Sequence, residues 1–113
     1  MRRIIFTIYI NIPDDQLDNP GHYSPDGILQ DTDKSKKTKD ALTKYKDHLI
    51  NRQKQYADKL SVDYKVFEWD EEYTNFVEHF KINYPQISHY DIICFYKHHL
   101  MLLLAEQYDQ ICY

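Results

Sequence analysis

The chain has 113 residues, which supports one domain at most. Charged residues make up 28% of it and the formal net charge is −4, so a nucleic-acid backbone is not the expected partner. No apolar stretch approaches the length of a membrane span, and the first apolar run lacks the cleavage site of a signal peptide. Cys94 and Cys112 lie far apart within apolar runs, which predicts two buried thiols in a reducing, cytoplasmic compartment.

The first predicted element is a strand. Residues 3–12 are nearly continuous in apolar, mostly β-branched side chains, which is typical of a strand covered on both faces, and residues 4–10 form its predicted centre. Pro13 ends this run. Residues 13–35 then form a predicted loop with turn signals and no periodicity, and a loop of this length is expected to be either functional or mobile.

A long helix is predicted next, over residues 36–60. Lys and Asp are interleaved on one side of it, which indicates a solvated face. The other face is marked by apolar side chains at helical spacing: Leu42, Tyr45, Leu49, Tyr56 and Leu60.

Two further strands and two further helices follow. A strand is predicted over residues 64–69, and a helix over residues 70–84 ends before Pro85. The next helix, for which Ser88 is a candidate cap, leads to an apolar strand at residues 111–113.

The alternation of strands and helices predicts an α/β fold with three layers, in which helices flank a mostly parallel, Rossmann-like sheet. Residues 4–10 and 64–69 are expected to be parallel neighbours in one sheet with residues 111–113. The last strand is only three residues long, so we expect the chain to be the front portion of a longer domain.

Open parallel sheets bind ligands at the carboxyl ends of their strands. This rule selects Thr7, Tyr9 and Asn11 at the first strand and Asp70 after the second. Asp70 has two interpretations, as an acceptor for a base or ribose hydrogen bond or as a helix cap. Lys97 lies in the helix before the last strand and could reach a diphosphate, with an ordinary surface lysine as the alternative.

Several other kinds of site are not indicated. The two glycines, Gly21 and Gly27, do not have the spacing of a phosphate-binding loop, which argues against a Rossmann dehydrogenase or a P-loop enzyme. No Ser-His-Asp or Cys-His nucleophile motif is visible. Cys94 and His98 share a helix face, but such isolated pairs usually pack or face solvent, so no metal site is predicted.

Residues 95–113 resemble the segment that precedes the metal-binding Asp-x-Asp motif in glycosyltransferases of the GT-A fold. In that family a helix carrying a Lys or Arg is followed by a Tyr-Asp turn and an apolar strand. Lys97 and the Tyr-Asp pair at residues 108–109 match this pattern. Residues 51–67 are similar to the family's helix, turn and second strand, and residues 4–11 to its nucleotide-binding first strand.

One departure from the family concerns the Asp-x-Asp motif itself. This chain has none at the family's position, and Asp31-Thr-Asp33, which has the same spelling, lies in the predicted loop. The family's metal-binding and acceptor-binding parts are therefore missing from these residues.

The resemblance implies an incomplete GT-A-type domain that serves as the donor-binding, N-terminal part of a glycosyltransferase. In a complete protein that continues past Tyr113, Mn²⁺ or Mg²⁺ would assist sugar transfer to an acceptor, whereas these 113 residues alone would bind no metal and would not catalyse. The alternative is a small non-catalytic α/β interaction module or a decayed remnant. The residues that the resemblance assigns to the nucleotide-diphosphate sugar are Thr7, Tyr9, Asn11, Asp70 and Lys97.

Overall fold

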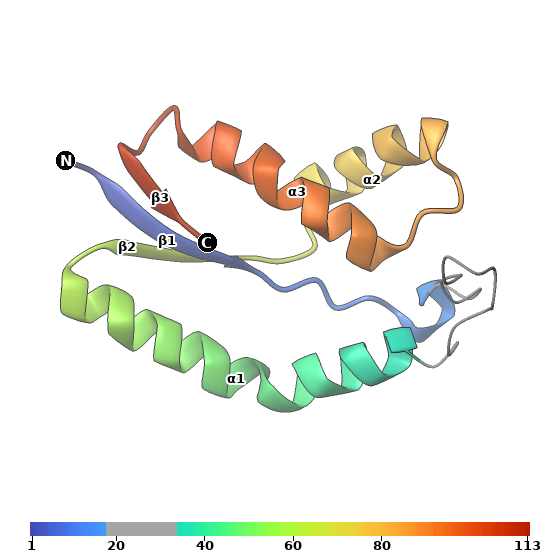
Figure 1. Cartoon of the computed structure of the whole chain (residues 1–113), viewed down its shortest axis with the longest axis horizontal. Helices are drawn as coiled ribbons and strands as arrows, with labels where there is room; N and C mark the ends of the chain where they lie inside the picture. The colour runs from blue at the N-terminus through green and yellow to red at the C-terminus, as the bar shows by residue number, and fades with distance from the viewer. Residues whose placement is uncertain (18–33) are drawn as a thin grey trace, which may run out of the picture.

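The structure, a computed structural model, describes residues 1–17 and 34–113. Each predicted strand and helix is present; the first strand ends at Ile8, four residues before the end of the predicted run, and the other ends differ by two residues at most. Most of the predicted loop over residues 13–35 lies outside the described residues. The elements (Figure 1) are β1 (Arg3–Ile8), a 3-10 helix η1 (Asp14–Gln16), α1 (Lys34–Leu60), β2 (Asp63–Phe67), α2 (Glu71–Asn83), α3 (His89–Leu104) and β3 (Gln110–Cys112).

The three strands form one parallel sheet in the order β2-β1-β3. β1 lies in the middle, with its Ile5 opposite Tyr64 of β2 and opposite Cys112 of β3. The prediction that the first two strands are parallel neighbours, and that the third belongs to the same sheet, is confirmed. The chain therefore passes through α1 to one side of β1, and through α2 and α3 to its other side.

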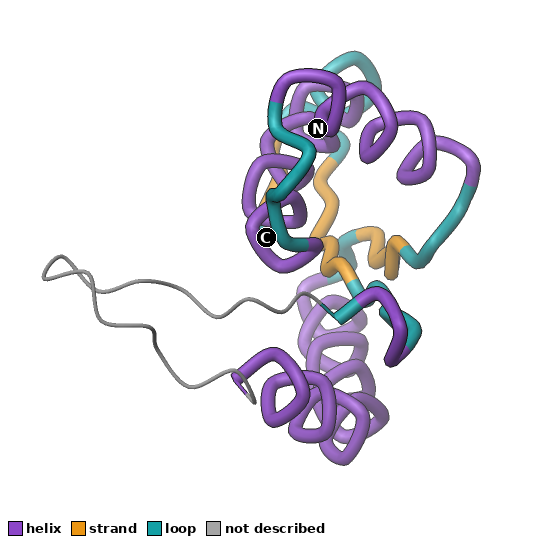
Figure 2. The backbone as a smooth tube through the Cα atoms, turned by 90° about the vertical axis from the view of Figure 1, so that its right-hand side faces the viewer, coloured by secondary structure: helices purple, strands orange, loops and turns teal. Residues whose placement is uncertain are grey.

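The helices are divided between the two faces of the sheet. Figure 1 and Figure 2 show α1 on one side of the strands and α2 with α3 on the opposite side. Right-handed crossovers explain this three-layer arrangement. The connections from β1 to β2 and from β2 to β3 run in opposite directions across the sheet, so their helices lie on opposite faces. Within the described ranges, no helix is both long enough and apolar enough to cross a lipid bilayer.

Local signals explain where the helices begin and end. α1 ends at Leu60; the next residue, Ser61, has a left-handed φ of 56°, and the N–H of Val62 donates to the carbonyl of Ala57 at 3.0 Å. The left-handed residue turns the chain away from the helix, and the hydrogen bond pairs a carbonyl of the last helical turn that would otherwise lack a partner. Ser88 caps α3 as predicted, because its hydroxyl oxygen accepts a hydrogen bond from the N–H of Asp91 at 3.1 Å.

The main core lies between the sheet and the pair α2 and α3. Phe6 of β1, Tyr73 of α2 and Tyr96 of α3 are almost fully buried in it. The ring centroids of Tyr73 and Tyr96 are 5.1 Å apart in an edge-to-face arrangement, which is favourable for aromatic pairs. The apolar face of α2 points inward, because its members all belong to this core or pack against it: Tyr73, Phe76, Val77 and Phe80.

α1 touches the other face of the sheet through a narrow strip of its surface. Ala57 is fully buried, and Lys46, Ile50 and Gln53 are half-buried. The small Ala57 side chain lets the helix approach the sheet closely. The five apolar residues predicted for one face of α1 do lie on one face, but they project beside this contact and stay 39–59% exposed.

Both cysteines are exposed, so the prediction of buried thiols is wrong. The buried side of α3 carries Ile92, Tyr96 and Leu100, and Cys94 lies about half a turn away from them. Cys112 lies on the edge strand β3, on a part of the sheet that α1 leaves uncovered. Both cysteines have apolar neighbours in the sequence, but such neighbours surround exposed positions as well as buried ones.

The hydroxyl group of Tyr96 is buried and has no hydrogen-bond partner among the described residues. Burial raises the pKa of this phenol, with smaller contributions from Asp70 and Glu72. We expect Tyr96→Phe to raise the free energy of unfolding by about 1 kcal/mol, because it removes an unsatisfied polar group from the core. Urea unfolding measures this change.

Tyr73→Phe is the matched control for that prediction. The hydroxyl group of Tyr73 lies 2.8 Å from Nδ1 of the buried His89. Losing this contact should lower the free energy of unfolding by about 1 kcal/mol or more, since the His89 nitrogen loses its partner. A loss of stability in Tyr96→Phe as large as that in Tyr73→Phe would contradict the prediction.

Candidate functional site

The order of the strands selects one position in the sheet for a ligand. The chain moves to one side of β1 through α1 and to the other side through α3, so the order reverses at β1. Open parallel sheets bind ligands at the carboxyl ends of the strands where such a reversal occurs. Here this position lies at the carboxyl ends of β1 and β3, and we call it the switch-point site.

Thr7 and Tyr9 form the part of the site on the α1 side of the sheet, where both are half-buried. The N–H of Tyr9 donates to the carbonyl of Phe67 at 2.8 Å, which extends the pairing of β1 with β2. The ammonium group of Lys46 lies 4.2 Å from the centroid of the Tyr9 ring and 3.4 Å from Oε1 of Glu68. This cation–π contact and ion pair hold Lys46 at the end of β1.

Lys97 and Tyr113 form the part of the site on the α3 side. The ammonium group of Lys97 lies 5.0 Å from the centroid of the Tyr113 ring, and that ring lies 5.2 Å from the ring of Phe6. Partial burial raises the pKa of the Tyr113 phenol, and Cys94 adds a smaller increase. Lys97 is thus placed against the residue that directly follows β3.

Asn11 and Asp70 lie apart from these contacts. Asn11 is exposed beyond the end of β1. Asp70 follows β2, which lies on the far side of β1 from β3. Its Oδ1 accepts a hydrogen bond from the N–H of Tyr73 at 2.9 Å, and its backbone is extended, as expected for the cap of α2. Asp70 therefore has the structural role that the sequence offered as the alternative to ligand binding.

We expect Asp70→Ala to lower the free energy of unfolding by about 1 kcal/mol, because it removes the cap of α2. Asp70→Asn should retain most of the stability, since asparagine caps helices about as well as aspartate. Thermal or urea unfolding of the two variants distinguishes these outcomes. Equal stability of Asp70→Ala and the unaltered protein would contradict the capping role.

Sequence reasoning missed two members of this site, Lys46 and Tyr113. α1 follows β1 and runs back along the sheet, so the residues in its first half lie near the carboxyl end of β1. That topology is the signal that could have identified Lys46. Tyr113 directly follows the last strand, so the rule that selected Tyr9 also applies to it.

The site offers two ammonium groups and two phenol rings at the same end of the sheet. Lysine ammonium groups bind phosphate oxygens, and aromatic rings stack on nucleobases. Across residues 1–17 and 34–113, no three His, Cys, Asp or Glu side chains gather as a set of metal ligands. Asp31 and Asp33 lie outside the described residues.

The chain matches no protein-family model, no curated protein and no solved structure. The structure itself defines the fold as α/β, with a three-stranded parallel sheet between two layers of helices.

Proposed function

We propose that the chain is the donor-binding, N-terminal part of a cytoplasmic glycosyltransferase of the GT-A type, which transfers a sugar from a nucleotide-diphosphate sugar. One observation carries this proposal: the ammonium group of Lys97 on α3 lies over the ring of Tyr113, which directly follows β3, next to the point where the parallel strand order reverses. In the family that residues 95–113 resemble, a helix with a cationic side chain likewise precedes the strand that leads into the Asp-x-Asp motif.

The charges at the site suit the leaving group of such a reaction. Departure of a nucleoside diphosphate concentrates negative charge, which fixed cations stabilise. Lys97 and Lys46 lie on the two sides of the sheet at its carboxyl end and supply such cations. Tyr9 and Tyr113 provide ring surfaces for the base. In complete enzymes of that family, a divalent cation held by the Asp-x-Asp carboxylates adds Lewis-acid assistance. We propose that these carboxylates follow β3 in a longer protein.

Calorimetric titration with uridine and guanosine diphosphate sugars, with and without Mn²⁺, tests this proposal. Two proteins are compared. One is the 113-residue chain, and the other is extended by the residues that the coding region specifies after Tyr113. We expect the longer protein to bind one donor in a metal-dependent manner and to transfer its sugar. The 113-residue chain should bind the nucleotide without catalysing transfer. Metal-dependent transfer by the short chain, or no binding of either nucleotide by the longer protein, would contradict the proposal.

A second candidate function is a non-catalytic interaction module. The exposed apolar face of α1 favours it, because surfaces of this kind mark contact sites for other proteins.

A further inference from the structure

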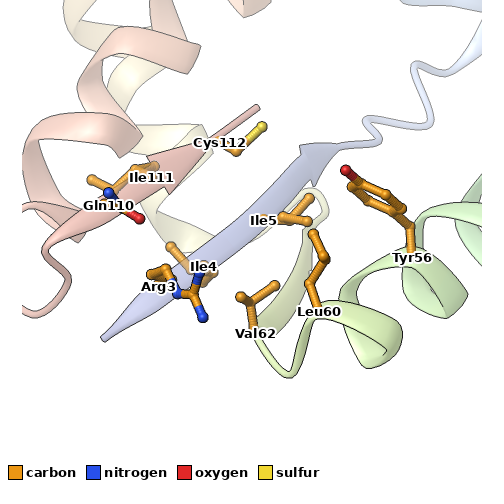
Figure 3. Close-up of a pocket in the computed structure, with 9 residues that line it drawn as sticks. All are labelled: Arg3, Ile4, Ile5, Tyr56, Leu60, Val62, Gln110, Ile111 and Cys112. Carbon is orange, nitrogen blue, oxygen red and sulfur yellow. The ribbon is translucent and has the colours of Figure 1, made fainter. Parts of the chain in front are cut away.

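Two pockets with no lining residue in common lie along α1, between the helix and the sheet, and we treat them as the two parts of one groove. Its larger part has a volume of about 220 Å³ and lies beside the last turns of α1 (Figure 3). The side chains of Tyr56 and Leu60 form one wall, and Ile5 and Cys112 belong to the sheet opposite them. The smaller part, of about 70 Å³, lies further toward the start of α1 and is lined by Leu42, Leu49, Thr7 and Tyr9, among others. We call both parts together the α1 groove.

The helix wall of the α1 groove is apolar and open to solvent. Tyr56 is 59% exposed and Leu49 is 48% exposed, although both are large apolar side chains. The apolar residues recur at helical spacing from Leu42 to Leu60, a distance of roughly 27 Å along the helix axis. Arg52 and Gln53 interrupt this strip between Leu49 and Tyr56, but exposed apolar side chains grouped on one helix face mark a contact surface.

The sheet beneath the groove also lacks a cover. Parallel sheets are normally covered by helices on both faces. α1 packs through Ala57, which is fully buried, and leaves Cys112 of β3 exposed on the same side. The uncovered space therefore lies beside α1, over β1 and β3, and it has the form that a second helix alongside α1 would fill.

The charges around the groove specify the chemistry of such a helix. Arg3 and Lys46 are the charged residues that line the groove, and both are cationic, although Lys46 already pairs with Glu68 at 3.4 Å. α1 itself carries nine basic and three acidic residues, whereas the chain as a whole has a net charge of −4. Complementary charge guides association and selects among partners. The groove is thus matched to a segment whose charged residues are acidic.

We propose that the α1 groove binds an acidic amphipathic helix of a partner protein. The helix places an apolar face of about five turns against α1 and the sheet, in the manner of helix-in-groove recognition. Its carboxylates lie at the flanks, toward Arg3 and Lys46. The concave shape of the groove favours an inserted helix over a flat anionic membrane, which a basic amphipathic helix would otherwise also suit.

Two synthetic peptides of roughly 18 residues test this proposal. Both carry leucines on one helix face, and their flanking residues are glutamate in one and lysine in the other. We expect the glutamate peptide to bind the 113-residue chain at least about tenfold more tightly than the lysine peptide, as measured by fluorescence anisotropy. Arg3→Glu should reduce this preference.

The double variant Leu49→Ser/Tyr56→Ser should weaken binding of the glutamate peptide by about tenfold or more. Leu102→Ser is the control, because Leu102 is 74% exposed on α3 and lies on the other side of the sheet. Circular dichroism confirms that the variants fold. Equal binding of the two peptides, or an unaffected double variant, would overturn the proposal. Binding to phosphatidylserine vesicles that the double variant loses, without binding of the glutamate peptide, would assign the groove to a membrane surface instead.

Discussion

Phe6→Ala is expected to lower the free energy of unfolding by about 3–5 kcal/mol, because it opens a cavity at the centre of the core. Phe6 is 1% exposed, and its ring contacts those of Phe67 at 5.8 Å and Tyr113 at 5.2 Å between centroids. Small domains have a total stability of about 5–15 kcal/mol, so this loss removes a large fraction of it.

Urea unfolding followed by circular dichroism measures the effect of Phe6→Ala. Ile82→Ala is the control, since Ile82 is 74% exposed on α2 and its truncation should change stability by less than about 0.5 kcal/mol. Phe6→Leu should fall between the two, because leucine fills part of the cavity. If Phe6→Ala were as stable as Ile82→Ala, the core would not be centred on β1.

The second large effect concerns the proposed nucleotide site. Lys97→Met is expected to weaken binding of a nucleoside diphosphate by about tenfold or more, because a charge-assisted contact contributes about 1.5–3 kcal/mol. Methionine retains the apolar stem that packs near Tyr113 and removes the charge. The effect should therefore appear in the dissociation constant and not in the free energy of unfolding.

Lys54→Met provides the matched control for Lys97→Met. Lys54 is exposed on the second half of α1, toward the amino ends of the strands, so its replacement removes the same charge far from the site. Titration calorimetry with uridine and guanosine diphosphate measures both variants. An equal loss of affinity in Lys54→Met and Lys97→Met would show that net charge, and not a local contact, governs binding.

The type and order of the elements were predictable because each carries a local signal. The β-branched run after Arg3 indicates a buried strand, and Pro13 marks its end. Pro85 separates α2 from α3, and Ser88 marks where α3 begins. The parallel pairing of β1 with β2 follows from the strand–helix–strand order, since this connection is long enough to return the chain in the same direction.

Contacts between the elements were not predictable in the same way. Apolar spacing shows that Leu49 and Tyr56 share a face of α1, but it does not show whether another element covers that face. The exposure of Cys94 depends on which side of α3 meets the sheet. The contact of Lys46 with Tyr9 depends on how α1 crosses β1. These features are set by packing angles between elements, on which the local sequence pattern carries no information.

The most direct test of the proposed site is a heteronuclear NMR titration of the ¹⁵N-labelled 113-residue chain with uridine and guanosine diphosphate. We predict chemical-shift changes at the amides of Tyr9 and Tyr113, which directly follow β1 and β3. The amide of Ile82 on α2 should not change. An absence of changes at millimolar nucleotide, or changes confined to α2, would contradict nucleotide binding at the switch-point site.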